Sequence, residues 1–181
     1  MTSAGADGQG EPLLTVYTDG SSKGNPGAAG WCWWISDQCW QAGGLELATN
    51  NVAELTAVER ALHSLAALPA VPLLVVTDSR YVLDTMTRYI YAYRRNGWRT
   101  ARGSAVANSQ LIASIEHLAS ARQSLSWRWQ RGHVGAFGNT QADAGASMAA
   151  VVAGRGKPAV AGPGFSKELA LASCRRHNQV H

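Results

Sequence analysis

Two short apolar segments of the sequence end in the same dipeptide and decide the arrangement of the chain. The first is LLTVYTD at 13–19, and the second is VPLLVVTD at 71–78. Both are rich in Val and Leu, which is typical of buried strands. Between them, residues 49–68 show the i, i+3, i+7 apolar spacing of an amphipathic helix. A strand, a crossover helix and a second strand in one sheet make the two strands parallel, so both Thr-Asp pairs are expected at the same sheet edge.

The remaining segments complete a mixed α/β pattern. A polar loop is expected after Asp19, and then GWCWWIS at 30–36 and QCWQAGGLELA at 38–48 alternate in the manner of two antiparallel strands. Beyond the second Thr-Asp pair, the patterns predict a short helix after Ser79, a helix at 109–120, a strand at 125–132 and a helix at 140–153.

Length and composition bound the organisation of the chain. The 181 residues fit one domain with a remainder, and a hydrophobic content of 46% is sufficient for a core. We expect a flexible leader at 1–11, a folded domain at 12–152 and a mobile tail at 153–181, where Gly, Pro and Ala dominate. A short docking helix or an additional basic contact is the alternative for the tail.

Charge and cysteine usage indicate the environment. Only 15% of residues are charged, so a net charge of +4 favours a polyanionic partner, usually nucleic acid, although many basic proteins bind none. No apolar run reaches the ~20 residues needed to span a bilayer, and the first residues lack the pattern of a secretory signal. The three cysteines are odd in number and lack a CxxC spacing, which predicts reduced thiols and a cytoplasmic location.

Four acidic residues are candidates for a common site. Asp19 and Asp78 end the two predicted parallel strands, Glu54 lies early in the predicted helix between them, and Asp143 lies early in the last helix. Gathered carboxylates repel one another, and divalent cations such as Mg²⁺ or Mn²⁺ make the arrangement favourable. Each acid alone also has an ordinary explanation: Asp19 as a turn residue, Asp78 as a helix cap, Glu54 on an exposed helix face, and Asp143 as a favourable charge near a helix start.

The order of several motifs carries a family resemblance. The segments YTDGSSKGNPGAAG, TNNVAELTAV, VTDSRYV, YAYRRNGWRT and RGHVGAFGNTQAD occur in this order between residues 13 and 150. In this, the chain resembles type 1 ribonuclease H. The resemblance implies the ribonuclease H-like fold, an α/β architecture with a five-stranded mixed sheet and helices on both faces.

The resemblance also implies a reaction and its residues. Asp19, Glu54, Asp78 and Asp143 correspond to the metal-binding catalytic carboxylates, with two Mg²⁺ ions, or Mn²⁺ in their place, as cofactors. The implied activity is endonucleolytic hydrolysis of the RNA strand of RNA–DNA hybrids, leaving 5′-phosphate and 3′-hydroxyl ends. His133 corresponds to a flexible histidine that assists proton transfer or product release.

Two groups of residues are expected to contact the substrate. The first would read ribose hydroxyls and a phosphate of the DNA strand: Asn25, Thr49, Asn50 and Asn51. The second would form a basic protrusion that grips the backbone of the DNA strand: Tyr89, Tyr93, Arg94, Arg95, Trp98 and Arg99.

Two alternative functions are open at this stage. One is a hybrid-binding protein without catalysis, which would be free to lose the acids, yet all four positions are filled. The other is a different nuclease or integrase-like protein of the same fold. The predicted protrusion and the RGHVG segment argue against this second alternative. Thr140 stands where the family often has an acid. We expect a monomer that acts on hybrids, with no membrane association and no obligate protein partner.

Overall fold

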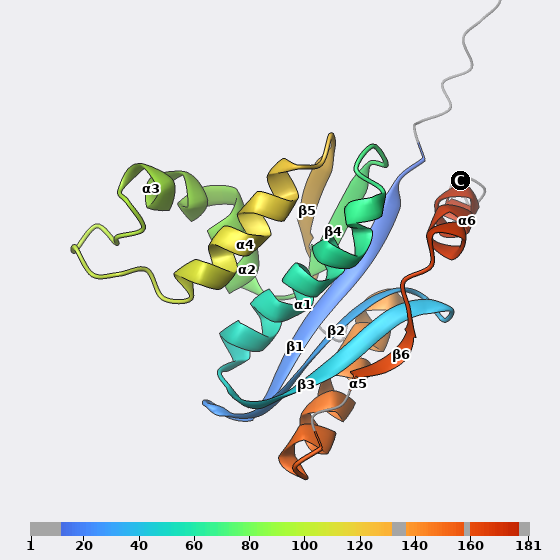
Figure 1. Cartoon of the computed structure of the whole chain (residues 1–181), viewed down its shortest axis with the longest axis horizontal. Coiled ribbons are helices and arrows are strands. Elements are labelled where there is room, and N and C mark those ends of the chain that lie inside the picture. The colour runs from blue at the N-terminus through green and yellow to red at the C-terminus, as the bar shows by residue number, and fades with distance from the viewer. Residues whose placement is uncertain (1–11, 132–136, 158–159, 178–181) are drawn as a thin grey trace, which may run out of the picture.

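A mixed sheet with the strand order β5-β4-β1-β2-β3-β6 forms the centre of the molecule (Figure 1). The computed structural model describes residues 12–131, 137–157 and 160–177. The strands are β1 (Leu14–Gly24), β2 (Gly27–Ser36), β3 (Cys39–Ala48), β4 (Leu73–Thr77), β5 (Leu125–Trp129) and β6 (Val160–Gly164). The predicted α/β class is confirmed, and the sheet has six strands where five were expected.

Helices cover both faces of this sheet. Helices α1 and α4 lie on one face and α5 on the other (Figure 1). The helical elements are α1 (Asn50–Ser64), η1 (Leu65–Ala67), α2 (Arg80–Asp84), η2 (Thr85–Tyr89), α3 (Ile90–Arg95), α4 (Ser109–Ser120), α5 (Phe137–Gly154) and α6 (Lys167–His177). Because α2, the π-helical turn η2 and α3 follow one another directly, the short helix expected after Ser79 extends to Arg95.

The two strands that were expected to end in Thr-Asp are parallel neighbours, as predicted. β1 pairs with β4 so that Tyr17 lies opposite Val76 and Thr18 opposite Thr77. The following residues, Asp19 and Asp78, therefore leave this pairing at the same level of the sheet.

The polar segment after Asp19 is a strand rather than the expected loop. β1 continues to Gly24 and pairs with β2, with Ser21 opposite Gly30. Gly20 makes this continuation possible beside α1, because a Cβ at Gly20 would clash with the backbone of Ala53 and Glu54. Backbone pairing with β2 thus outweighs the low strand propensity of these small polar residues.

The alternation predicted for β2 separates its side chains between the two faces. Trp31, Trp33 and Ile35 belong to the main core with the buried residues of α1, whereas Cys32 packs with Ala146 of α5. Close packing of α5 requires small residues on this face, since a Cβ at Gly30 would clash with the backbone of that helix. The period of two in the sequence is therefore used for packing on both sides.

Residues 160–164 and 167–177 form a strand and a helix within the segment where a mobile tail was expected. β6 pairs antiparallel with β3, and α6 buries Ala170 and Cys174 in the main core. These two residues are four apart, so they lie on one face of the helix. The open edge of β3 is a ready template for a further strand, and Pro163 is acceptable in β6 because β6 is an edge strand. The domain limits at 12 and 152 stay a prediction.

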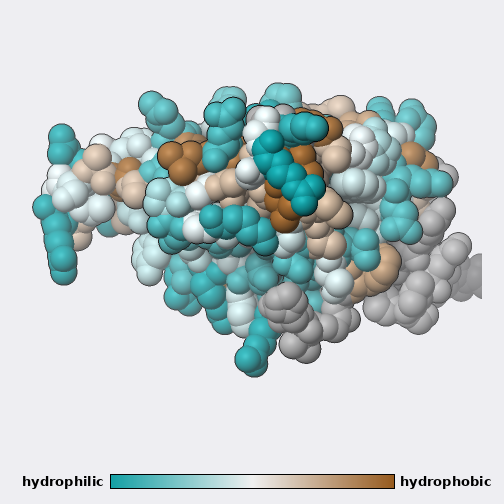
Figure 2. All heavy atoms as spheres, turned by 90° about the horizontal axis from the view of Figure 1, so that it is seen from below, coloured by the Kyte–Doolittle hydropathy of each residue, from teal (hydrophilic) through white to brown (hydrophobic). Residues whose placement is uncertain are grey.

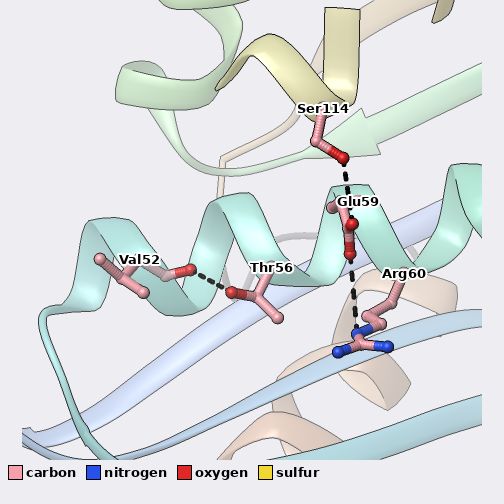
Figure 3. A network of polar contacts seen from close by, with 5 residues as sticks. All are labelled: Val52, Thr56, Glu59, Arg60 and Ser114. Atoms are coloured by element: carbon pink, nitrogen blue, oxygen red, sulfur yellow. Dashed lines mark hydrogen bonds and ion pairs between the residues drawn. The ribbon is translucent and has the colours of Figure 1, made fainter. Parts of the chain in front are cut away.

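A polar network joins α1 to α4 on the outside of the sheet. Ser114 Oγ donates to Glu59 Oε1 at 3.1 Å, and Arg60 lies 3.6 Å from the other oxygen of that carboxylate (Figure 3). Thr56 Oγ1 donates to the carbonyl oxygen of Val52 within α1 at 2.7 Å (Figure 3). Glu59 therefore connects α1 to α4.

The structure also bears on two expectations from the sequence, the state of the cysteines and the lack of a membrane-spanning segment. The cysteines Cys32, Cys39 and Cys174 are free, buried thiols, as predicted. Among the helices of residues 12–131, 137–157 and 160–177, none has the length and apolar character required to cross a bilayer.

Candidate active site

Three carboxylates meet at the sheet edge where β4 ends. Asp19 lies on β1, Asp78 follows β4 directly, and Glu54 reaches the same point from the second turn of α1. One carboxylate oxygen from each lies within 4.8 Å of the others. The parallel register of β1 and β4 brings Asp19 and Asp78 together, and the absence of a side chain at Gly20 lets α1 approach with Glu54.

Burial and mutual repulsion favour the protonated forms of two of these acids. Asp19 is only 6% exposed, and burial, followed by the charges of Asp78 and Asp143, raises its pKa to about 8. Glu54 is 5% exposed, and burial, followed by the charges of Asp19 and Asp78, raises its pKa well above the ordinary value. The amide of Gly20 and the side chain of Asn50 act in the opposite direction on Glu54. A site with this much unfavourable negative charge is suited to a cation.

The fourth predicted acid, Asp143, adjoins the cluster from the opposite face of the sheet. It lies in the second turn of α5, close enough to Asp19 for its negative charge to raise the pKa of that residue. The carboxyl of Asp143 therefore adds to the repulsion that acts on Asp19, although it lies outside the group of three. The four acids therefore come from β1, α1, α5 and the residue after β4.

The donor set fits a hard divalent cation. The Oε2 atom of Glu54 is buried and has no hydrogen-bond partner among the described residues. An unpaired buried carboxylate oxygen is costly unless a cation binds it. Oxygen ligands alone, with neither Cys nor His in the described cluster, are the ligands that Mg²⁺ and Mn²⁺ prefer.

Two of the predicted substrate residues, Asn25 and Asn50, are hydrogen-bonded to each other beside the start of α1. Thr49 caps the helix, accepting a hydrogen bond from the Val52 amide, and Asn25 Oδ1 accepts one from the Asn50 amide at 3.1 Å. Asn50 Nδ2 lies 3.5 Å from Glu54 Oε1, which connects this group to the acid cluster. Asn51 is exposed on the first turn. The turn between β1 and β2 is thereby fixed against α1 beside the candidate site.

The predicted basic protrusion is formed by the end of η2, by α3 and by the loop that follows α3. Its tip extends to the left in Figure 1, and hydrophilic side chains project there in the view from below (Figure 2). The rings of Tyr89 and Tyr93 are 6.2 Å apart, and Arg94 forms an ion pair with Glu116 of α4 at 2.9 Å. Arg95 is exposed.

The protrusion is fixed to the body by its aromatic residues. Tyr93 and Trp98 pack against the main core. The Trp98 amide donates to the Tyr93 carbonyl at 2.7 Å, and Arg99 donates to the Gly103 carbonyl at 2.8 Å. Trp98 and Arg99 therefore shape the loop, and Arg94, Arg95 and Arg99, which are all exposed, remain the candidates for phosphate contacts.

Two predicted residues, His133 and Thr140, are not part of the acid cluster as the structure describes it. His133 is outside the described residues. Thr140 is exposed in the first turn of α5. Sequence reasoning did not single out Trp129, whose indole donates to the backbone carbonyl of Asp78 at 2.9 Å. The only signal in the sequence is a Trp at the end of a strand, which is more commonly a packing residue.

A comparison with protein families decides the assignment. The family model described as RNase H matches residues 11–151, which include every acid of the cluster. The chain belongs to the ribonuclease H family. This membership confirms the predicted family, and with it the fold and an enzyme of the ribonuclease H type.

Individual members of the ribonuclease H family agree with this assignment. The chain is 37% identical over 157 residues to a ribonuclease H of Tropheryma whipplei, a match that spans 87% of this chain and 96% of that protein. It is 47% identical over 141 residues to ribonuclease HI of Streptomyces coelicolor, spanning 74% of this chain and 60% of that protein. Its structure is similar to that of LC9-RNase H1, described as a type 1 RNase H with the type 2 active-site motif. The TM-score is 0.66 and the identity 26%, over 91% of this chain and 86% of the other.

Proposed function

We propose that the protein hydrolyses the RNA strand of RNA–DNA hybrids at the cluster of Asp19, Glu54, Asp78 and Asp143. The observation that carries the proposal is the meeting of three carboxylates within 4.8 Å at the sheet edge of a ribonuclease H-family chain. The products would be a 5′-phosphate and a 3′-hydroxyl end.

The four acids would hold two Mg²⁺ ions, or Mn²⁺ in their place. Bound divalent ions supply Lewis-acid stabilisation of a phosphoryl oxygen and lower the pKa of a bound water. The protein's part is to present its carboxylates in fixed positions. Asp19 is held within β1, and Asp78 directly follows β4 and is hydrogen-bonded to Trp129 of β5. Glu54 lies on a helix that packs closely on Gly20. The buried Oε2 of Glu54 gains a partner when a cation binds.

The chain's own residues would also position the hybrid. The first turn of α1, with Asn50 and Asn51, borders the acids and would read ribose hydroxyls in the shallow minor groove, together with Asn25. Thr49 would contact a phosphate of the DNA strand.

The protrusion would grip the backbone of the DNA strand further away. Arg95 is exposed there, whereas Arg94 already pairs with Glu116 and would exchange that partner for a phosphate. His133 would move a proton or assist product release near neutral pH. A cytoplasmic, monomeric protein remains our expectation.

The experiment that tests this function is cleavage of an end-labelled RNA–DNA hybrid by the full-length protein, with Mg²⁺ and with EDTA. Single-stranded RNA, duplex RNA and duplex DNA serve as matched controls. We expect metal-dependent cutting of the RNA strand of the hybrid alone. Tight binding of the hybrid without cutting, in Mg²⁺ and Mn²⁺ alike, would contradict the proposed activity and favour a non-catalytic binder.

A further inference from the structure

A side chain of β5 holds the backbone of Asp78 beyond the end of the sheet ladder. β5 runs parallel to β4, and Trp129 lies opposite Thr77, the last residue of β4. The Gln130 amide donates to the Thr77 carbonyl at 2.9 Å, which completes the ladder. One residue further, the indole Nε1 of Trp129 donates to the Asp78 carbonyl at 2.9 Å. The hydrogen bonds from β5 to the chain at the end of β4 therefore reach one residue further, from Thr77 to Asp78.

The same peptide group is also bonded at its other end. The peptide that joins Asp78 to Ser79 carries the Asp78 carbonyl and the Ser79 amide. This amide donates to Thr77 Oγ1 at 3.1 Å, and Thr77 is fully buried. Because a peptide group is planar, bonds to both its oxygen and its nitrogen fix its orientation. The direction in which the Asp78 side chain leaves the backbone is restricted accordingly.

Arg80 holds the indole in place. Its guanidinium carbon lies 3.7 Å from the centre of the Trp129 ring, which is the geometry of a cation–π contact. An indole has a single donor and no acceptor, so the ring's orientation is set by the bond to Asp78 and by this stacking.

Asp78 requires such a restraint because of its neighbours. Its carboxylate lies within 4.8 Å of those of Asp19 and Glu54, and like charges at this separation repel. A side chain on a freely rotating peptide would relieve the repulsion by turning away from the cluster. A cation would then find one ligand fewer in position.

We propose that Trp129 is a positioning residue for divalent-cation binding, which acts by fixing the Asp78 peptide so that the Asp78 carboxylate stays beside Asp19 and Glu54. The inference rests on the proposed function of these acids as a cation site. Trp129 acts through the backbone of a ligand and not on the substrate.

The test compares Trp129→Phe with the wild-type chain in two measurements. Phe keeps an aromatic ring for Arg80 and removes the N–H donor. In the absence of substrate, the rise of Tm during a Mg²⁺ titration reports cation affinity, which we expect to fall by about tenfold, as is typical when a partner of a metal ligand is lost. In hybrid cleavage, the Mg²⁺ requirement should rise by a similar factor while KM for the hybrid is unchanged.

Two further variants make the result specific. Trp127→Phe alters the tryptophan two residues earlier on β5, which packs against the core, and should leave the Mg²⁺ titration unchanged. Trp129→His keeps a ring N–H donor and should retain more of the cation affinity than Phe. Circular dichroism verifies that each variant is folded.

The outcomes separate this inference from the proposed function. A Trp129→Phe chain that responds to Mg²⁺ as the wild type does would overturn the role of Trp129, and so would an equal loss in Trp127→Phe. Absence of hybrid cleavage by a wild-type chain that still gains Tm from Mg²⁺ would contradict the proposed activity alone. A wild-type Tm that does not respond to Mg²⁺ would overturn the cation site and this inference together.

Discussion

Asp19 is the residue on which the candidate site most depends. It lies on β1, near Asp78 and Asp143, and its own burial makes its negative charge unfavourable in the absence of a cation. The same features that raise its pKa would make it a strong ligand, because a bound divalent cation replaces the missing solvation. Stability and cation binding are therefore coupled at this position.

Replacing Asp19 by Asn should abolish hybrid cleavage and stabilise the metal-free protein. The amide has nearly the shape of the carboxylate and removes one charge from a repelling group. In EDTA at pH 8, we expect Tm to rise by about 2–4 °C for each kcal/mol of repulsion removed. Mg²⁺ should raise the Tm of the variant less than that of the wild type. Cleavage at the wild-type rate would remove Asp19 from the site.

The metal-free protein should lose stability as the pH rises from 4 to 8. The pKa of Asp19 is about 8 in the folded chain and 3.8 ordinarily, so in this interval the folded state binds more protons than the unfolded state. The free energy of unfolding then decreases with increasing pH, and Glu54 contributes in the same direction. Thermal unfolding in EDTA at pH 5 and pH 8 measures the effect. The same pair of measurements in Mg²⁺ should show a smaller decrease, and equal decreases in both buffers would contradict the coupling.

At the scale of the elements, small residues in β2 and α5 allow α5 to pack closely on the sheet and place Asp143 near Asp19. Asp143 is adjacent to Asp19 because α5 packs closely on β1 and β2, over glycines. This proximity places a ligand from a helix within reach of ligands from the opposite face.

Gly30→Ala should therefore destabilise the protein. Its Cβ would clash with the backbone of α5, and overpacking of this kind costs about 1–3 kcal/mol of the free energy of unfolding. Gly154→Ala is the matched control, since a Cβ there would lie 3.4 Å from that of Ala28, in ordinary contact. Urea unfolding of both variants measures the difference. Equal stabilities would show that α5 is free to move away from the sheet.

The protrusion permits a prediction about ionic interactions. We expect Arg94→Ala/Arg95→Ala to weaken hybrid binding and to reduce the slope of log Kd against log salt concentration by about one unit for each phosphate that the arginines had neutralised. Arg155→Ala, at an exposed position directly after α5, is the control and should leave the slope unchanged. Binding is measured with a fluorescent hybrid in EDTA over a range of salt concentrations. An unaltered slope in the double variant would argue against phosphate binding by this element.

At the scale of the whole molecule, β6 and α6 pack as part of the folded domain. β6 covers the edge of β3, and α6 adds Ala170 and Cys174 to the main core, whose other buried members in the described part of the chain precede residue 116. Edge strands that are covered in this way are protected from pairing with other chains.

Ala170→Asp tests whether α6 contributes to global stability. Ala170 is fully buried, so a carboxylate there should lower the free energy of unfolding by more than about 2 kcal/mol. Lys167→Asp, at an exposed position in the first turn of the same helix, should have little effect, because an acid near a helix N-terminus is favourable. If both variants unfold like the wild type, α6 does not stabilise the rest of the chain.

Three features of this protein could be predicted from its residues alone: the parallel pairing of the two Thr-Asp strands, the alternation of β2 and the meeting of Asp19 with Asp78 at one edge of the sheet. Each depends on a local period or on the order of elements along the chain, which a sequence displays directly. Three others became known only from the folded chain: β1 continues to Gly24, the sheet has a sixth strand, and Trp129 contacts Asp78. These features depend on partners distant in the chain, such as Trp129 and Asp78, which are 51 positions apart. No local pattern encodes which distant group completes a hydrogen bond.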